Sequence, residues 1–178
     1  MSEEDKGWID SLLAPSVSIS AGAIVIGSWM LILTIINIVF GAFSEGRKIN
    51  WIDFITNGSN TNSAHTVTLT VPDDLVFAIL SVSVIGAGIY GMGAAREGGF
   101  SAWVSKLPGD RIVTSLFSAQ GGLQRTLASW LILIGAMYYF IWSAFETTWV
   151  DPGVYSVMVA LVSIGIGIHW IEDSSSSG

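Results

Sequence analysis

Four long stretches of the chain contain no charged residue and are rich in apolar side chains: 11–44, 75–95, 126–145 and 152–171. An α-helix rises about 1.5 Å per residue, so roughly 20 residues cross the roughly 30 Å of bilayer hydrocarbon. Each stretch has the length that a membrane span needs. The sequence therefore predicts four transmembrane helices, at about 19–43, 74–95, 124–145 and 152–171.

The segments between these spans complete the expected architecture, an all-α integral membrane protein with one domain over 1–178 and its four helices in a compact bundle. We expect an external loop over 44–73, a cytoplasmic amphipathic loop over 96–123 and a disordered polar tail over 174–178. Residues 64–71 alternate polar and apolar and are rich in β-branched types, which predicts a short β segment in the external loop.

Lysine and arginine predict the orientation, because cytoplasmic loops are enriched in them. Five of the seven basic residues fall on the side of the amino terminus and the 96–123 loop: Lys6, Arg96, Lys106, Arg111 and Arg125. Arg47 and Lys48 fall on the other side. Both termini are therefore expected in the cytoplasm, and the N-glycosylation sequon at Asn57 falls outside.

Two short cytoplasmic segments carry apolar residues on one helical face, at 5–13 and 110–119. We expect interfacial helices there, with Trp8, Trp103 and Lys106 at headgroup depth. A docking surface for a cytoplasmic partner is the alternative.

The chain is acidic, with 14 Asp and Glu against seven Lys and Arg and a net charge of −7. That balance argues against nucleic acid as a partner. An acidic, lysine-poor surface is typical of proteins that stay hydrated in strong salt, so we expect a halophilic archaeal host or one of its viruses; an ordinary acidic membrane protein is the alternative. The chain has no Cys, which excludes thiol chemistry and disulfides.

Small residues recur every four positions in the second predicted span, where they indicate close packing of helices in lipid. The fourth span repeats the pattern and is its expected partner, while the bulkier third span is expected to face lipid. No internal repeat is evident between the first and second pairs of spans. The predicted helix-packing residues are Ser83, Ala87, Gly91, Ala95, Ser156, Ala160, Ser163 and Gly167. Gly86, Gly88 and Gly91 also match a dinucleotide-binding pattern, which we reject because no strand precedes them.

Few polar groups fall inside the spans. Asn37, with Ser28 and Thr34 on nearby turns, suits either hydrogen bonding between helices or the lining of a solute path. His169, beside Trp170 at the cytoplasmic end of the fourth predicted span, is expected at the interface. Six residues of the external face are expected to be solvated loop groups: Asp53, His65, Asp73, Asp74, Glu146 and Asp151.

No catalytic motif is present, and no metal or cofactor site is expected. The sequence favours a non-enzymatic multi-pass membrane protein with a structural or assembly role, as an accessory subunit of the cell membrane or a virion membrane protein. Its expected partners are the lipid bilayer and either further copies of itself or another membrane subunit. An oligomeric pore for a small solute or cation is the alternative function.

Overall fold

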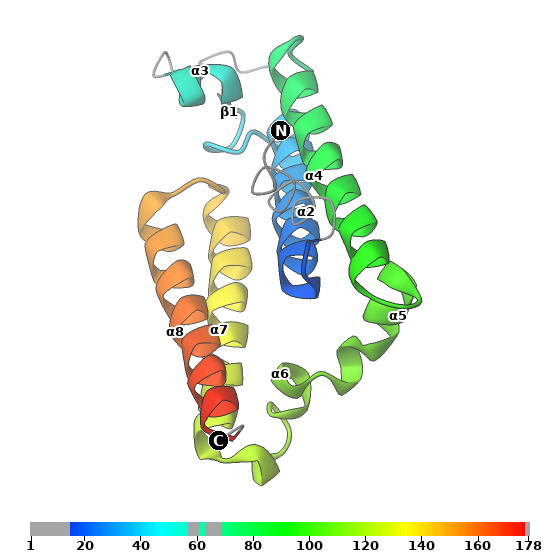
Figure 1. The fold of residues 1–178 in the computed structure, drawn as a ribbon. Helices are drawn as coiled ribbons and strands as arrows, with labels where there is room; N and C mark the ends of the chain where they lie inside the picture. The colour runs from blue at the N-terminus through cyan, green and yellow to red at the C-terminus, as the bar shows by residue number, and fades with distance from the viewer. Residues whose placement is uncertain (1–14, 57–60, 63–68, 177–178) are drawn as a thin grey trace. The chain divides into compact units, whose positions relative to one another are not determined.

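The computed structural model describes residues 15–56, 61–62 and 69–176, and it divides the chain into two compact units, 1–105 and 106–178 (Figure 1). Each unit is built around two long helices that pack against each other: α2 on α4 in the first unit and α7 on α8 in the second. We call these pairs hairpin 1 and hairpin 2.

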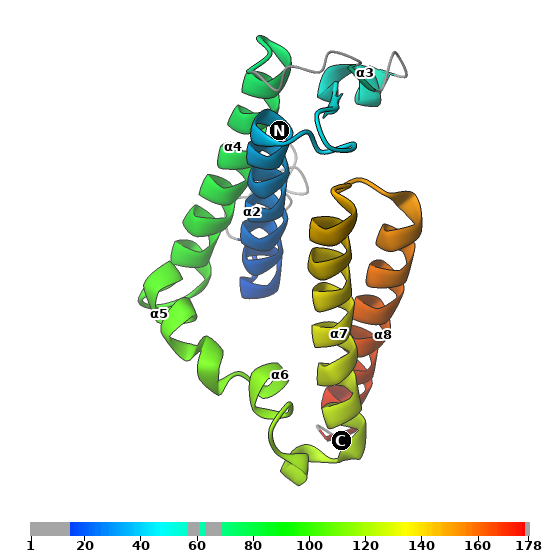
Figure 2. The ribbon, with the colours of Figure 1, turned by 180° about the vertical axis from the view of Figure 1, so that it is seen from behind.

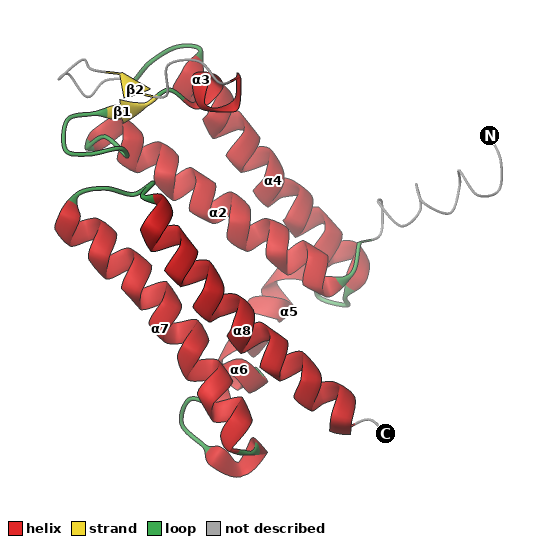
Figure 3. Ribbon diagram, turned by 90° about the vertical axis from the view of Figure 1, so that its left-hand side faces the viewer, coloured by secondary structure: helices red, strands yellow, loops and turns green. Residues whose placement is uncertain are grey.

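The first unit contains α2 (Val17–Val39), α3 (Trp51–Thr56), α4 (Asp73–Ala95) and most of α5 (Gly99–Lys106). Between α2 and α4 the chain also forms two very short strands, β1 (Lys48–Ile49) and β2 (Thr61–Asn62), which pair antiparallel (Figure 3). Most of the β segment predicted at 64–71 lies outside the described residues, and its described part, Leu69 to Val71, forms no strand.

The second unit contains two 3₁₀ turns, η1 (Leu107–Gly109) and η2 (Ala119–Gly121), with the single-turn helix α6 (Arg111–Thr114) between them. The long helices α7 (Leu123–Glu146) and α8 (Pro152–Ser176) follow, and Figure 2 shows them running side by side. The helix predicted over 110–119 is thus limited to one turn. The prediction of a disordered tail over 174–178 is also corrected, because Ser174 to Ser176 are the last residues of α8.

The four expected spans are confirmed as four helices that are long and apolar enough to cross a membrane. The first starts at Val17, because the Ser16 hydroxyl accepts a hydrogen bond from the Ile19 amide and caps the helix. It ends at Val39, four residues earlier than expected, because Gly41 adopts a left-handed conformation (φ +87°) that ends the helix.

A shared set of contacts closes hairpin 1. A Cβ atom placed on Gly88 would lie 2.8 Å from the carbonyl oxygen of Ser20 and 2.7 Å from Cγ1 of Ile24. The contact is reciprocal: a Cβ atom on Gly27 would lie 3.0 Å from the carbonyl oxygen of Ser81 and 2.8 Å from Cγ1 of Ile85. Only glycine allows the two backbones to approach this closely.

Hairpin 2 closes in the same way. A Cβ atom on Gly165 would lie 2.6 Å from both the carbonyl oxygen of Ala128 and Cγ1 of Ile132. A Cβ atom on Gly135 would lie 3.3 Å from the carbonyl oxygen of Met158 and 3.1 Å from Cγ2 of Val162.

All four long helices therefore carry one pattern of three residues. A β-branched residue lies four positions after the first residue, and a glycine lies seven positions after that same first residue. We call each instance a packing triplet: Ser20, Ile24 and Gly27; Ser81, Ile85 and Gly88; Ala128, Ile132 and Gly135; Met158, Val162 and Gly165. The expectation that the chain lacks an internal repeat is wrong at this level, because each glycine faces the first two members of the triplet on its partner helix.

The remaining faces of the long helices carry large apolar side chains that the chain leaves exposed. Val25 is 60% exposed, Ile79 58%, Ile134 51% and Ile164 54%. The third span is not wholly outward, however, since Tyr139 is buried in hairpin 2.

Candidate functional site

The most elaborate polar site lies in the first unit, where the connection 40–72 meets the ends of α2 and α4. Lys48 and Asp74 form an ion pair there, and both side chains are buried, Asp74 completely. Lys48 Nζ also donates to Thr70 Oγ1 at 3.1 Å, and the Thr70 amide donates to Asp74 Oδ2 at 2.7 Å. A buried ion pair is tolerated only when further hydrogen bonds compensate both charges, as they do here.

Asn37, in the last turn of α2, completes this site. Its amide nitrogen donates to Asp74 Oδ1 and to the Ile49 carbonyl oxygen, each at 3.0 Å. Its oxygen accepts from the Ile49 amide at 2.8 Å and the Ala42 amide at 3.3 Å. One side chain thus joins α2, β1 and α4, so the expected hydrogen bond between helices is present.

Asp73 fixes the next part of the connection. Its two carboxylate oxygens accept from the Ile52 amide at 2.7 Å and the Trp51 amide at 3.0 Å, at the start of α3. The Trp51 ring stacks on Phe77 of α4, with centroids 4.1 Å apart. We call Asn37, Lys48, Thr70, Asp73 and Asp74 the loop clamp.

The loop clamp overturns the expectation of solvated charges for Asp73 and Asp74. Asp151 instead accepts from the Val154 amide at 2.9 Å at the start of α8, and Asp53 accepts from Asn50 at 3.3 Å. Glu146 is exposed, as expected. His65 and the sequon residue Asn57 lie outside the described residues, as do Lys6 and Trp8 with the predicted 5–13 helix.

Hairpin 2 has its own polar groups where α7 begins and α8 ends. His169, expected at the interface, is only 5% exposed, and its Nε2 lies 3.0 Å from the Ser129 hydroxyl. One helical turn further, Arg125 contacts Oδ1 of Asp173 at 2.5 Å, and Arg111 contacts the same oxygen at 2.8 Å. These contacts join α7 to α8 and to the chain before α7.

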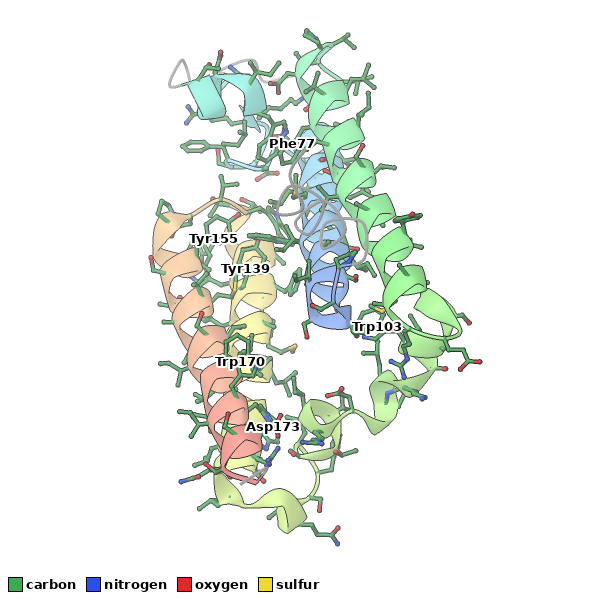
Figure 4. The ribbon with its side chains drawn as sticks, in the orientation of Figure 1. Phe77, Trp103, Tyr139, Tyr155, Trp170 and Asp173 are labelled. Carbon is green, nitrogen blue, oxygen red and sulfur yellow. The ribbon has the colours of Figure 1, made fainter. Side chains whose placement is uncertain are left out.

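At the opposite end of hairpin 2 an aromatic cluster takes the place of ions. The hydroxyls of Tyr139 and Tyr155 both donate to the Trp149 carbonyl oxygen, at 3.0 and 2.6 Å. The two tyrosine rings stack with centroids 5.4 Å apart, and Figure 4 shows them together on neighbouring helices. The short turn 147–151 is held by these groups.

Neither hairpin offers an open catalytic arrangement among the described residues. Ser129 and His169 resemble a nucleophile with its base, but Ser129 is 1% exposed. The nearby surface recess is lined by Gln124, Leu127, Ile168, Ile171 and Glu172 and includes neither residue. Within the part of the chain that the structure describes, no group of three His, Asp or Glu side chains could hold a metal ion.

The proposed polar lining has other partners. Thr34 is buried and donates to the Met30 carbonyl oxygen of its own helix at 2.9 Å, and Asn37 belongs to the loop clamp. Ser28 is half-buried. Two of the three side chains therefore have a local structural role.

The residues predicted for helix packing lie mostly outside the hairpin contacts. Gly91 is buried, where a Cβ atom would lie 2.7 Å from the Ser20 hydroxyl, and Gly167 is half-buried. The other six are exposed: Ser83, Ala87, Ala95, Ser156, Ala160 and Ser163. We call these six the outer small residues.

Sequence reasoning missed the loop clamp, although a signal was present. Asn37 falls near the end of the first predicted span and Asp74 at the start of the second. Two consecutive antiparallel helices bring such residues to the same level. Lys48 entered the prediction only as a basic residue that favours one orientation in the membrane, although it pairs with Asp74.

Comparison with known proteins gives no relative: no protein-family model, curated protein or solved structure matches the chain.

Proposed function

We propose that this chain is a non-enzymatic multi-pass membrane protein whose role is assembly, with copies of itself or with another membrane subunit. The observation that carries the proposal is the exposure of the outer small residues on α4 and α8, while each hairpin closes through its own packing triplets. In lipid, helices associate where small residues let backbones approach closely. The outer small residues provide such a surface for a further helix.

The exposed apolar faces support the membrane location. Large aliphatic side chains such as Ile79 and Ile164 are more than half exposed, which suits lipid better than water. Tyr90 is 67% exposed and Trp170 71%, toward the ends of α4 and α8 that carry the 96–123 loop and the carboxyl terminus. Aromatic residues of this kind are enriched at membrane surfaces.

The proposal includes the orientation of the chain in the membrane and the kind of host. Arg96, Lys106 and Arg111 lie between the second and third long helices and Arg125 lies at the start of the third, which favours a cytoplasmic location for that segment and for both termini. The acidic excess favours a salt-rich host, a halophilic archaeon or its virus.

The assembly role is tested by enlarging the outer small residues. Ala87→Leu together with Ala160→Leu should leave each hairpin folded, because both side chains are exposed, and should abolish association. Crosslinking in native membranes and sedimentation in detergent measure the assembled size. Val82→Leu is the matched control, since Val82 is 56% exposed on a different face of α4.

An assembled size that is unchanged in the double variant would overturn the proposal. So would a wild-type chain that is monomeric in its native membrane and purifies with no partner.

A further inference from the structure

Helix α5 has an apolar face that the rest of the described chain leaves open. Phe100, Trp103 and Val104 follow the spacing i, i+3 and i+4, which places them on one side of the helix. Phe100 is 37% exposed and Val104 42%, while Trp103 is half-buried. The phenyl and indole rings of Phe100 and Trp103 lie together on this side, with centroids 6.0 Å apart.

The position of α5 follows from the length of α4. That helix has 23 residues, so at about 1.5 Å per residue it matches the roughly 30 Å hydrocarbon thickness and ends near the membrane surface. The Gly99 amide donates to the Arg96 carbonyl oxygen at 3.0 Å, so one tight turn separates the two helices. Helix α5 therefore begins at the depth of the lipid headgroups.

Two glycines direct the chain out of the line of α4. Gly98 and Gly99 have φ values of +77° and +54°, a region that other residues rarely adopt. Figures 1 and 2 show α5 turning away from the axis of α4 directly after this point. A helix that leaves a membrane span at an angle runs along the surface rather than away from it.

The charges at the two ends of α5 suit the same environment. Arg96 precedes the helix and Lys106 is its last residue, and Lys106 is exposed. Basic side chains beside an apolar helical face can reach phosphate groups while the apolar face enters the acyl region.

We propose that α5 is a membrane-surface anchor, with the face formed by Phe100, Trp103 and Val104 inserted at the boundary between headgroups and acyl chains. Its partner is the lipid surface itself. The anchor fixes the depth at which α4 ends. This inference rests on the membrane location proposed above.

The test uses single cysteines, which report cleanly because the chain has none of its own. Val104→Cys and Ser105→Cys place a fluorophore on neighbouring residues that a helix turns about 100° apart, the first on the apolar face and the second off it. Val82→Cys, on the exposed side of α4, reports on the hydrocarbon. Each labelled protein is reconstituted into phosphatidylcholine and phosphatidylglycerol vesicles that contain either spin-labelled lipid or aqueous iodide.

The expected result is loss of the Val104 signal with lipid quencher, loss of the Ser105 signal with iodide, and quenching at Val82 by deep spin labels. If Val82 is quenched from the lipid but Val104 and Ser105 respond equally to iodide, the anchor is overturned while the membrane location stands. Protection of Val104 from both quenchers also overturns it, in favour of a protein on that face. If Val82 responds to iodide, the membrane location itself fails.

Discussion

Hairpins 1 and 2 share the same helix contacts in the middle of their helices but differ in the connections that join their helices. In both, reciprocal packing triplets bring glycine against the carbonyl oxygen and β-branched side chain of the partner helix. Their connections differ: residues 40–72 join α2 to α4 and are held by a buried ion pair, whereas residues 147–151 join α7 to α8 and are held by tyrosine hydroxyls. Glycine contacts in the middle of each helix therefore set the helix pairing. The polar groups at the helix ends differ because they hold connections of different length.

A long connection needs more than a turn to hold it in place. Outside α3 and the short β1–β2 pairing, its described backbone groups need other partners, and Asn37, Asp73 and Asp74 supply some of them from the helix ends. The five-residue turn needs less, because Thr147 in a left-handed conformation (φ 52°) already ends α7.

The largest effect is expected at the loop clamp. Lys48→Met leaves Asp74 buried without its cation, which should destabilise the first unit by about 3–5 kcal/mol. Reversible unfolding in detergent micelles measures the free energy. Glu45→Gln, in the same connection but exposed, is the control and should match the wild type.

If Lys48→Met is as stable as the wild type, the connection is held by something other than the clamp. Adding Asp74→Leu should recover part of the loss, because the unpaired carboxylate is then removed.

The next largest effect is expected at the glycine contacts that both hairpins share. Gly88→Ala and Gly165→Ala each place a methyl group within 3 Å of a backbone oxygen, at 2.8 and 2.6 Å. The helices must move apart, at a cost of about 1–3 kcal/mol in each hairpin. Gly86→Ala and Gly167→Ala are the matched controls, since a Cβ atom there meets no atom within 4 Å. In thermal unfolding, Gly88→Ala and Gly165→Ala should both be less stable than the two control variants. A loss of stability confined to one hairpin would refute the idea that both hairpins close through the same glycine contacts.

The smallest effect is expected at the short connection of hairpin 2. Tyr155→Phe removes a hydroxyl that donates to the Trp149 carbonyl oxygen and should cost about 1 kcal/mol. The Tyr139 hydroxyl still donates to that oxygen, so the carbonyl keeps a partner. Tyr90→Phe, whose side chain is largely exposed, is the comparison. A loss from Tyr155→Phe as large as that from Lys48→Met would remove the difference between the two ends.

The sequence predicted the four long helices well because length and apolar content decide them locally. It did not predict which face of each helix makes contact. Small residues recur every four positions from Ser83 to Ala95 and dominate the pattern, yet Ser83 and Ala87 are exposed while Ser81 and Gly88 are buried. Choosing between adjacent faces requires the register of the partner helix, which one helix alone does not contain.

The amphipathic segment shows a different limit. The spacing of apolar residues predicts an interfacial helix over 110–119, but the structure has only one helical turn there, Arg111–Thr114, and an eight-residue helix at Gly99–Lys106. In the structure Gly98 turns the chain and Gly99 begins α5. A glycine pair can therefore start a helix in a new direction as well as end the previous one.

The loop clamp also imposes an order on biogenesis. The ribosome makes Asn37 and Lys48 before Asp74, so the carboxylate that joins them is missing while the connection emerges. The connection can reach its final conformation only after α4 has formed beside α2. The loop clamp therefore cannot be complete until Asp74 has been made, 37 residues after Asn37, whereas at the short turn of hairpin 2 the Trp149 carbonyl oxygen accepts from tyrosines that lie 10 and 6 residues away.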